Sequence, residues 1–306
     1  MDRLEAMAIF VAVVETGGFT AASRRLGVPL PTVSRKVGEL EAHIGTRLLV
    51  RSTRRLALTD AGSAYFQSCK RILDEVNEAE NTASGEQSAP KGELVVTAPI
   101  AFGRLHVLPL VTEFLGLYTD IDVRMLLSDR NAHLLEDQID LAVRIGELPD
   151  SSMIGTRVGS LRRVVCGSPP YFERHGTPSN PDDLVGLPCV TFEMPGSRTS
   201  WSFTSGSKGR GHTVEVNSRL SVNTAEAALD AAAAGVGITR VLSYQAANAV
   251  AQGALRVVLE AFEPDPIPVY LLHQAQGTLP LKMRSFLDFA APRLRNRLVK
   301  ISLADL

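Results

Sequence analysis

The sequence contains few of the residues that secreted or metal-dependent proteins need. Its 306 residues include only three cysteines, Cys69, Cys166 and Cys189, which are odd in number and widely scattered. They match neither a disulfide framework nor a zinc site, so we expect reduced thiols in a cytoplasmic protein. The six histidines are isolated and lack metal-ligand spacing. We therefore expect no metal and no cofactor.

Long apolar segments are also missing from the sequence. The first residues, MDRLEAMAIFVAVVETG, are interrupted by Glu5 and Glu15 and are not followed by a small-residue cleavage site, so they do not form a signal peptide. No apolar run approaches the ~18 residues of a membrane span, and we expect no membrane partner. The hydrophobic content of 45% and charged content of 21% are ordinary for a soluble globular protein, and the length suggests two or more domains.

Motifs of common enzymes are absent. The sequence has no G-x-S-x-G, and no Gly-rich phosphate loop follows a predicted strand. Cys166 and His175 lie near each other in the sequence and could form a nucleophilic pair. However, Cys166 ends an apolar strand, where a cysteine is usually inert packing. We therefore expect that the protein is not an enzyme.

A helix-turn-helix pattern fills residues 18–59. Thr20 is expected to cap a first helix that runs to Leu26, and Gly27 lies where that helix should stop. After a short break, Pro31 suits the first turn of a second helix, which is predicted to end near Ile44 because Gly45 follows.

The second helix has one apolar face and one polar, basic face. Val33, Val37, Leu40 and Ile44 are spaced 4, 3 and 4 residues apart, which predicts that they pack inward. A helix of this kind fits the major groove of DNA, with its N-terminal residues at the base edges. The residues predicted to contact DNA from this helix are Thr32, Ser34, Arg35 and Lys36.

Positive charge is concentrated in this region. Between Thr20 and Thr59 there are eight Lys or Arg residues and two acidic ones, so the region carries 8 − 2 = +6, whereas the whole chain carries −1. This asymmetry is typical of proteins that bind phosphates with one part only. The alternative is a solvated basic surface around an ordinary pair of helices.

A predicted hairpin follows the second helix, in LLVRSTRRLALT, with its turn at residues 52–55. It resembles a wing that would place Arg51, Arg54 and Arg55 over a groove edge or the DNA backbone. The alternative is a charged hairpin tip that contacts nothing.

The run GFTAASRRLGVPLPTVSRKVGELEAHIGTRLLVRSTRRLALTDAG resembles the N-terminal domain of LysR-type transcriptional regulators. The resemblance rests on AA after the first Thr, LG before the turn, Ser-Arg in the second helix, LE before a Gly, R-L-L-x-R and LT-x-x-G. Leu30 and Pro31 depart from the small polar residues usual there. The resemblance implies a DNA-binding domain in which Ser23 supports the recognition helix. It also implies RNA polymerase as a partner if the protein activates transcription.

Residues 60–87 are predicted to form one long helix. It carries a narrow apolar stripe that includes Tyr65, Phe66, Ile72 and Val76, too few residues for a buried core helix. Such a stripe suits pairing with a second copy of the chain. In the LysR family this helix forms an antiparallel pair, which implies a homodimer or homotetramer. The alternative is a helix that lies on its own domain.

A polar break at residues 84–92 precedes a change to alternating strands and helices, including a short helix predicted at 133–138. We predict a winged helix-turn-helix at 1–59, a linker and dimerisation helix at 60–88, and an effector-binding domain at 89–306. Lobe 1 is predicted at 92–161 and 267–300, and lobe 2 at 162–266. The fold class is α plus α/β, and the two mostly parallel α/β lobes resemble periplasmic solute-binding proteins.

A ligand of such a domain is expected between the lobes, beyond the carboxyl ends of the strands. Helix starts near Ile100 and Thr224 offer N–H groups that attract anions, and Arg144 supplies a cation. We therefore expect a small organic effector, such as an organic acid. The predicted effector-binding residues are Thr97, Pro99, Ile100, Ser128, Arg144, Gly146, Asn223 and Thr224.

Each of these effector residues also has a structural interpretation. Ser128 and Thr224 can simply cap helices, and Arg144 can pair with a surface carboxylate. Trp201, the single tryptophan, could line the cleft between the lobes, but a tryptophan in such a run is more often in the core. The sequence therefore predicts an effector-responsive DNA-binding regulator that binds double-stranded DNA. The alternative is a DNA-binding regulator without a ligand, whose α/β region serves oligomerisation or partner contacts.

Overall fold

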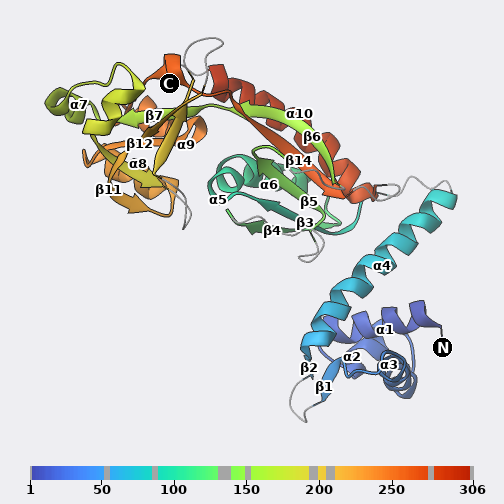
Figure 1. The fold of residues 1–306 in the computed structure, drawn as a ribbon. Coiled ribbons are helices and arrows are strands. Elements are labelled where there is room, and N and C mark those ends of the chain that lie inside the picture. Colours follow the sequence, from blue (N-terminus) through green and yellow to red (C-terminus); the bar gives the residue numbers. More distant parts are fainter. Residues whose placement is uncertain are drawn as a thin grey trace. The chain divides into compact units, whose positions relative to one another are not determined.

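The computed structural model describes residues 2–51, 56–84, 89–129, 139–148, 153–192, 199–204, 211–274 and 279–303. The chain forms two compact units, Met1–Gly92 and Glu93–Leu306. The first unit contains α1 (Arg3–Glu15), α2 (Phe19–Leu26), α3 (Leu30–Ile44), β1 (Leu49–Arg51), β2 (Leu56–Leu58) and α4 (Asp60–Ser84) (Figure 1).

Helices α2 and α3 form the predicted helix-turn-helix. Gly27 ends α2 in the left-handed conformation with φ 66°, as expected of a residue without a side chain. The hydroxyl of Ser23 donates to the Val28 carbonyl at 2.6 Å and closes the turn. The prediction that Thr20 caps α2 is wrong, because the helix begins at Phe19 with Gly18 as its N-cap, and Thr20 lies inside its first turn.

The core of the first unit lies where α1, α3 and α4 meet. Phe10, Val13, Val33 and Leu40 are fully buried in it. Ile44 was predicted to face inward but is 37% exposed, because the last turn of α3 extends beyond the residues that cover Leu40. The apolar periodicity of α3 continues one turn further than its packing.

The start of the wing is attached to α3 by the side chain of Glu41. The strands pair antiparallel, with Leu49 opposite Leu58, and the carboxylate of Glu41 accepts hydrogen bonds from the amides of Leu48 and Leu49 at 2.8 and 3.0 Å. A Cβ added at Gly62 would lie 2.0 Å from the Leu48 carbonyl oxygen. Glycine is therefore required where α4 passes the wing, which gives the LT-x-x-G motif a physical reason.

The first half of α4 packs on its own unit. The ring of Phe10 lies 5.9 Å from that of Tyr65 and 6.4 Å from that of Phe66, and Cys69 is buried beside them. Tyr65 and Phe66 therefore belong to the domain core, as the alternative interpretation of this helix had it. Ile72, Leu73 and Val76, further along, are partly exposed. The predicted extension to residue 87 lies outside the described residues.

Lobe 1 of the second unit is a mixed sheet with helices packed on it. Its strands follow the order β4-β3-β5-β14-β6, and β14 runs antiparallel to both β5 and β6, so the lobe is less parallel than predicted. The helix predicted at 133–138 lies outside the described residues. The elements are β3 (Gly92–Ala98), α5 (Ile100–Phe102), a π-helix (Gly103–Val107), α6 (Leu108–Leu117), β4 (Ile121–Leu127), β5 (Leu141–Ile145), β6 (Met153–Leu161), β14 (Ile267–Gln274) and α10 (Leu281–Leu303).

Strand β6 was not predicted from the sequence. Its stretch MIGTRVGSL contains two glycines and reads as a loop. In the structure a Cβ at Gly159 would lie 2.7 Å from Cδ1 of Leu298, so this glycine allows α10 to pack closely on the strand. The long-range pairing of β6 with β14 stabilises a strand that local propensity does not favour.

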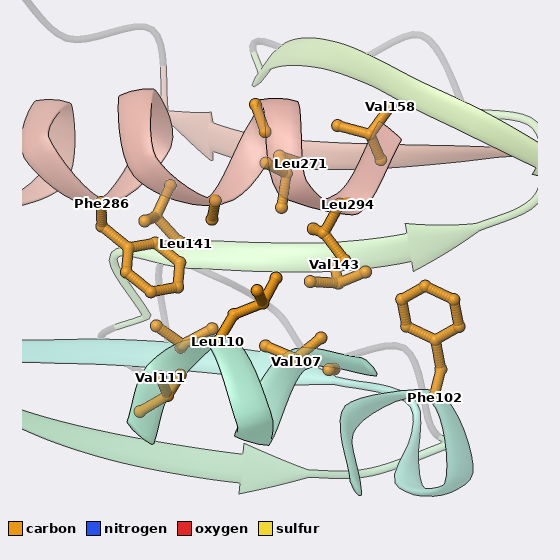
Figure 2. Packing of buried hydrophobic residues seen from close by; sticks show 14 of the residues in the cluster. Phe102, Val107, Leu110, Val111, Leu141, Val143, Val158, Leu271, Phe286 and Leu294 are labelled. Atoms are coloured by element: carbon orange, nitrogen blue, oxygen red, sulfur yellow. The ribbon is translucent and has the colours of Figure 1, made fainter. Parts of the chain in front are cut away.

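The helical run 100–117 buries a face that only partly agrees with the predicted one. Figure 2 shows Val107, Leu110 and Val111 beside Leu141 and Val143 of β5, with Phe286 and Leu294 of α10 across the same core. The sequence pattern predicts an inward face that carries Leu105, Leu108, Val111, Phe114 and Leu115. Val111 and Phe114 are buried, as predicted, whereas Leu105, Leu108 and Leu115 are 40%, 44% and 36% exposed. The run has two apolar stripes, and periodicity alone does not indicate which one is buried.

The same run, Ile100–Leu117, is long and apolar enough to cross a membrane by length and composition, contrary to the expectation that no run approaches that length. In the structure it packs on the sheet and α10 as a core helix of lobe 1.

Lobe 2 is a second mixed sheet, with strand order β11-β8-β12-β7-β13 and a separate antiparallel pair, β9 and β10. Trp201 is 3% exposed in its core, as expected. Helix α7 was not predicted. The elements are β7 (Arg163–Gly167), α7 (Pro169–His175), a 3-10 helix (Pro181–Gly186), β8 (Pro188–Phe192), β9 (Ser200–Phe203), β10 (His212–Glu215), β11 (Asn217–Val222), α8 (Ala225–Ala233), β12 (Ile238–Leu242), α9 (Ser243–Ala251), β13 (Arg256–Val258) and a second 3-10 helix (Glu260–Phe262).

The two segments that connect the lobes are joined by an ion pair. Arg162, between β6 and β7, donates from Nε and Nη2 to the two carboxylate oxygens of Glu263 at 2.8 and 2.9 Å. Its Nη2 also donates to Glu260 at 3.1 Å. This bidentate geometry fixes the connecting segments relative to each other at the hinge.

Candidate DNA-binding and effector-binding sites

The polar face of α3 lies opposite the buried face that carries Val33, Val37 and Leu40. The side chain of Arg35 is 59% exposed there, and its Nη1 donates to Oε1 of Glu39, one turn further along, at 2.5 Å. Thr32 and Ser34 are partly exposed near the start of the helix. These three predicted residues share the N-terminal half of α3.

Lys36 lies in a different environment from Arg35. Its ammonium forms an ion pair with Glu5 of α1, and its side chain is only 13% exposed. Along a helix, consecutive residues point about 100° apart, so Lys36 is directed toward α1 while Arg35 points to solvent. The structure therefore does not bring Lys36 and Arg35 together.

The structure describes the side chain of Ser23 but not those of the three predicted arginines of the wing. Ser23 uses its hydroxyl within the turn, which agrees with a supporting position. Arg51 belongs to β1, but its side chain lies outside the described part of the chain, as do Arg54 and Arg55.

In lobe 1, three segments meet at the carboxyl edge of the parallel strands. The amide of Ser128 donates to the Ala98 carbonyl at 3.0 Å, and the buried hydroxyl of Thr97 donates to the Leu126 carbonyl at 2.8 Å. The Thr97 hydroxyl therefore joins β3 to β4. Pro99 is the N-cap of α5, and Ile100 is 45% exposed at this edge.

The Ile100 amide has a protein partner that the sequence analysis missed. Oδ1 of Asp129 accepts its hydrogen bond at 3.0 Å. The expectation that this helix start offers its first N–H to an anion is therefore wrong, because a carboxylate already occupies that place. The signal available in the sequence was an Asp close after the apolar run that forms β4.

Arg144 and Gly146 lie at the end of β5, on the same edge. Strand β5 runs parallel to β3 with Ala142 opposite Thr97, so Arg144 lies two residues beyond Thr97 in register. Burial lowers the pKa of Arg144, which nevertheless remains a cation. Gly146 has φ 127°, which only glycine adopts without strain, and its amide donates to the Pro268 carbonyl at 2.9 Å.

In lobe 2, Asn223 and Thr224 follow β11 and precede α8. Both are exposed, and Oγ1 of Thr224 accepts a hydrogen bond from the Ala227 amide at 3.3 Å as the N-cap. Thr224 therefore caps a helix, which was the alternative to its predicted role in effector binding. The exposed side of this helix start is polar.

An aromatic contact joins the lobes and was also missed. Tyr244 lies in the first turn of α9 of lobe 2, but its ring packs on Phe102 and His106 of lobe 1 at centroid distances of 5.3 and 5.5 Å. Burial, together with the charges of Asp129 and Glu226, raises the pKa of Tyr244. An isolated Tyr in a predicted helix gives no sign in the sequence that its side chain lies at the contact between the lobes.

The candidate nucleophile of the sequence is not activated. Cys166 is fully buried in β7, and desolvation raises the pKa of its thiol to about 12. A thiol with so high a pKa remains protonated and unreactive near neutral pH.

A winged helix-turn-helix joined in one chain to a two-lobed α/β unit defines a class of DNA-binding transcriptional regulators. The family model described as the bacterial regulatory helix-turn-helix protein, lysR family, matches residues 4–63, and the LysR substrate binding domain matches residues 87–295. The chain belongs to the LysR family of transcriptional regulators, whose members are not enzymes.

Individual relatives are similar over nearly their whole length. An HTH-type transcriptional regulator of Xanthomonas campestris pv. campestris is 38% identical over 94% of this chain and 84% of its own. CrgA of Neisseria meningitidis, a solved LysR-type regulator, is 30% identical with a TM-score of 0.60, over 95% of this chain and 98% of that one. The Vibrio cholerae virulence activator AphB is 26% identical with a TM-score of 0.59, over 94% and 98%.

Proposed function

We propose that the protein recognises a specific DNA sequence through the N-terminal half of α3 and adjusts that binding in response to a small molecule held between the α/β lobes. The exposed Arg35, opposite the buried face of α3, is the observation that carries the DNA-binding half. Thr32 and Ser34 would contact bases or phosphates beside it. Arg51, Arg54 and Arg55 would bind the backbone from the wing.

Lys36 receives a different role in this proposal. Because its ammonium pairs with Glu5 and is largely covered, we assign it to the packing of α1 on α3. Ser23 likewise supports α3 by closing the turn before it.

Substitutions at Arg35 and Arg54 test the division of roles. Arg35→Ala should weaken binding to a duplex selected by the wild-type protein by about 1–3 kcal/mol, because it removes a base contact. Arg54→Ala should weaken binding to all sequences alike and flatten the salt dependence, because it removes a phosphate contact. Titrations of selected and shuffled duplexes across salt concentrations measure both. Equal effects of the two substitutions on both duplexes would contradict the proposal.

For the effector we propose the strand edges of the two lobes around Tyr244. Arg144, Ser128, Gly146 and Ile100 lie at the lobe 1 edge, and Asn223 and Thr224 at the lobe 2 helix start. Arg144 is the group that suits an organic acid, whereas Asp129 at the α5 start suits a donor group of the ligand. A small molecule with both kinds of group fits these residues best.

A thermal-shift screen of metabolites on the full chain tests the effector. A specific ligand raises the melting temperature by mass action, and Arg144→Ala should abolish the shift of an acidic ligand. A screen without any shift would favour the alternative, in which the α/β region serves only oligomerisation or partner contacts.

We further propose that the protein acts as a homodimer or homotetramer in the cytoplasm, where its DNA is. The partly exposed Ile72, Leu73 and Val76 of α4 support self-association, as does the exposed Leu108–Leu115 stripe of α6. If the protein activates transcription, RNA polymerase would be a further partner. Sedimentation of the free protein measures the oligomeric state.

A further inference from the structure

Glu39 is an acidic side chain on the recognition helix. It lies one turn after Arg35, is 37% exposed, and accepts a hydrogen bond from the guanidinium of Arg35 at 2.5 Å. The two side chains share the face of α3 that lies away from Val33, Val37 and Leu40. A carboxylate therefore lies on the face that we assign to DNA.

Charge makes this placement unusual. Between Thr20 and Thr59 the sequence has eight cations and only two acidic residues, Glu39 and Glu41. Glu41 has a structural task, because it accepts the backbone amides of Leu48 and Leu49 at the start of the wing. Glu39 would face the DNA phosphates with the same sign of charge, which weakens binding to any sequence.

Stability of the helix does not account for Glu39. An exposed ion pair one helical turn apart contributes little, since water and salt screen it. The order with the cation N-terminal to the acid is also the weaker of the two orders on a helix. The pair therefore needs a reason in what Arg35 does.

We propose that Glu39 is a positioning residue that fixes the guanidinium of Arg35 for base recognition. A free arginine side chain has many rotamers, and ordering it at the interface reduces affinity. The contact with Glu39 uses Nη1 of a group with five donors in a rigid plane, and the others remain for the O6 and N7 acceptors of a guanine. This inference rests on the proposed base contact of Arg35.

The test compares binding to a duplex selected by the wild-type protein with binding to a shuffled duplex, at one salt concentration. Glu39→Ala should tighten binding to the shuffled duplex, because it removes a negative charge. It should nevertheless lower the ratio of the affinity for the selected duplex to that for the shuffled duplex by about two- to tenfold. Glu39→Gln also tightens shuffled binding but should keep most of the ratio, because its amide oxygen still accepts from Arg35.

A double-mutant cycle distinguishes positioning from a direct role. In the Arg35→Ala background, Glu39→Ala should leave the ratio unchanged, since the group it positions is gone. A loss of ratio that persists in that background would overturn the proposal, as would an unchanged ratio in Glu39→Ala alone. Glu80→Ala, on the exposed surface of α4, is the control for net charge and should keep the wild-type ratio.

The two proposals fail in different ways. If Arg35→Ala keeps the wild-type ratio, the proposed base contact of α3 is wrong. If Arg35→Ala loses the ratio but Glu39→Ala keeps it, only the inference about Glu39 is wrong. Circular dichroism and melting of each variant confirm that the fold is retained.

Discussion

His106 is a histidine held in an apolar environment. It belongs to the π-helix of lobe 1, its ring lies 4.9 Å from Phe102 and 5.5 Å from Tyr244, and its buried Nε2 has no hydrogen-bond partner among the described residues. Desolvation, and secondly the charge of Arg297, lowers its pKa from 6.5 to about 4. The folded protein therefore favours the neutral imidazole.

This shift predicts a pH dependence of stability. Because the folded pKa lies below the unfolded one, the unfolded chain binds more protons between pH 6.5 and about 4. The stabilisation from neutral His106 is complete above pH 6.5 and is lost as the pH falls through about 4. In urea titrations across this window, the free energy of unfolding of His106→Gln should depend less steeply on pH than that of wild type. If the free energies of unfolding of wild type and His106→Gln changed with pH in parallel, the lowered pKa of His106 would be contradicted.

At the level of secondary-structure elements, α9 of lobe 2 connects the lobes, and Tyr244 is its residue in the lobe 1 core. Tyr244 is 6% exposed and packs within the lobe 1 core, although the rest of α9 packs on lobe 2. Together with the Arg162–Glu263 ion pair, it restricts the hinge from two sides. A ligand bound beside Tyr244 would therefore act directly on the contact between lobes.

Truncation of this side chain should be costly. Tyr244→Ala removes a buried aromatic ring and leaves a cavity, so we expect the free energy of unfolding of the second unit to fall by about 3–5 kcal/mol. Tyr244→Phe keeps the ring and should cost less than about 1.5 kcal/mol. Urea denaturation followed by the fluorescence of Trp201, in the lobe 2 core, measures both. If Tyr244→Ala and Tyr244→Phe lost similar amounts of unfolding free energy, the hydroxyl and not the ring would account for the stabilisation.

At the scale of the whole molecule, the two compact units should respond to different ligands. The single tryptophan, Trp201, lies in the second unit, so its fluorescence reports that unit alone, whereas far-UV circular dichroism reports both. A selected duplex at 100 times its Kd should stabilise the DNA-binding unit by about 2.7 kcal/mol. The duplex should raise the midpoint of the unfolding transition followed by circular dichroism and leave the midpoint followed by Trp201 fluorescence unchanged.

An effector should have the opposite signature and shift the fluorescence transition. A shuffled duplex at the same concentration is the control and should shift neither transition to the same extent. If the selected duplex shifts both transitions equally, the two units unfold as one, and their ligands cannot be separated by this measurement.

Several features of this protein follow from its sequence because their signals are local. The ends of α2 and α3 are set by Gly27 and Gly45, which adopt the left-handed conformation that few other residues tolerate. Val33, Val37 and Leu40 repeat at the helical period and are buried. The dense LysR motifs cover the same stretch, so fold class and family could both be predicted from it.

Other features were decided only by the tertiary structure, because they depend on partners far along the chain. Glu5 covers Lys36, Asp129 occupies the amide of Ile100, and Tyr244 of lobe 2 enters the core of lobe 1. The buried face of the run 100–117 and the existence of β6 likewise depend on α10 and β14. Periodicity and propensity describe what one segment can form, whereas packing decides which of its faces is covered and which polar group is already paired.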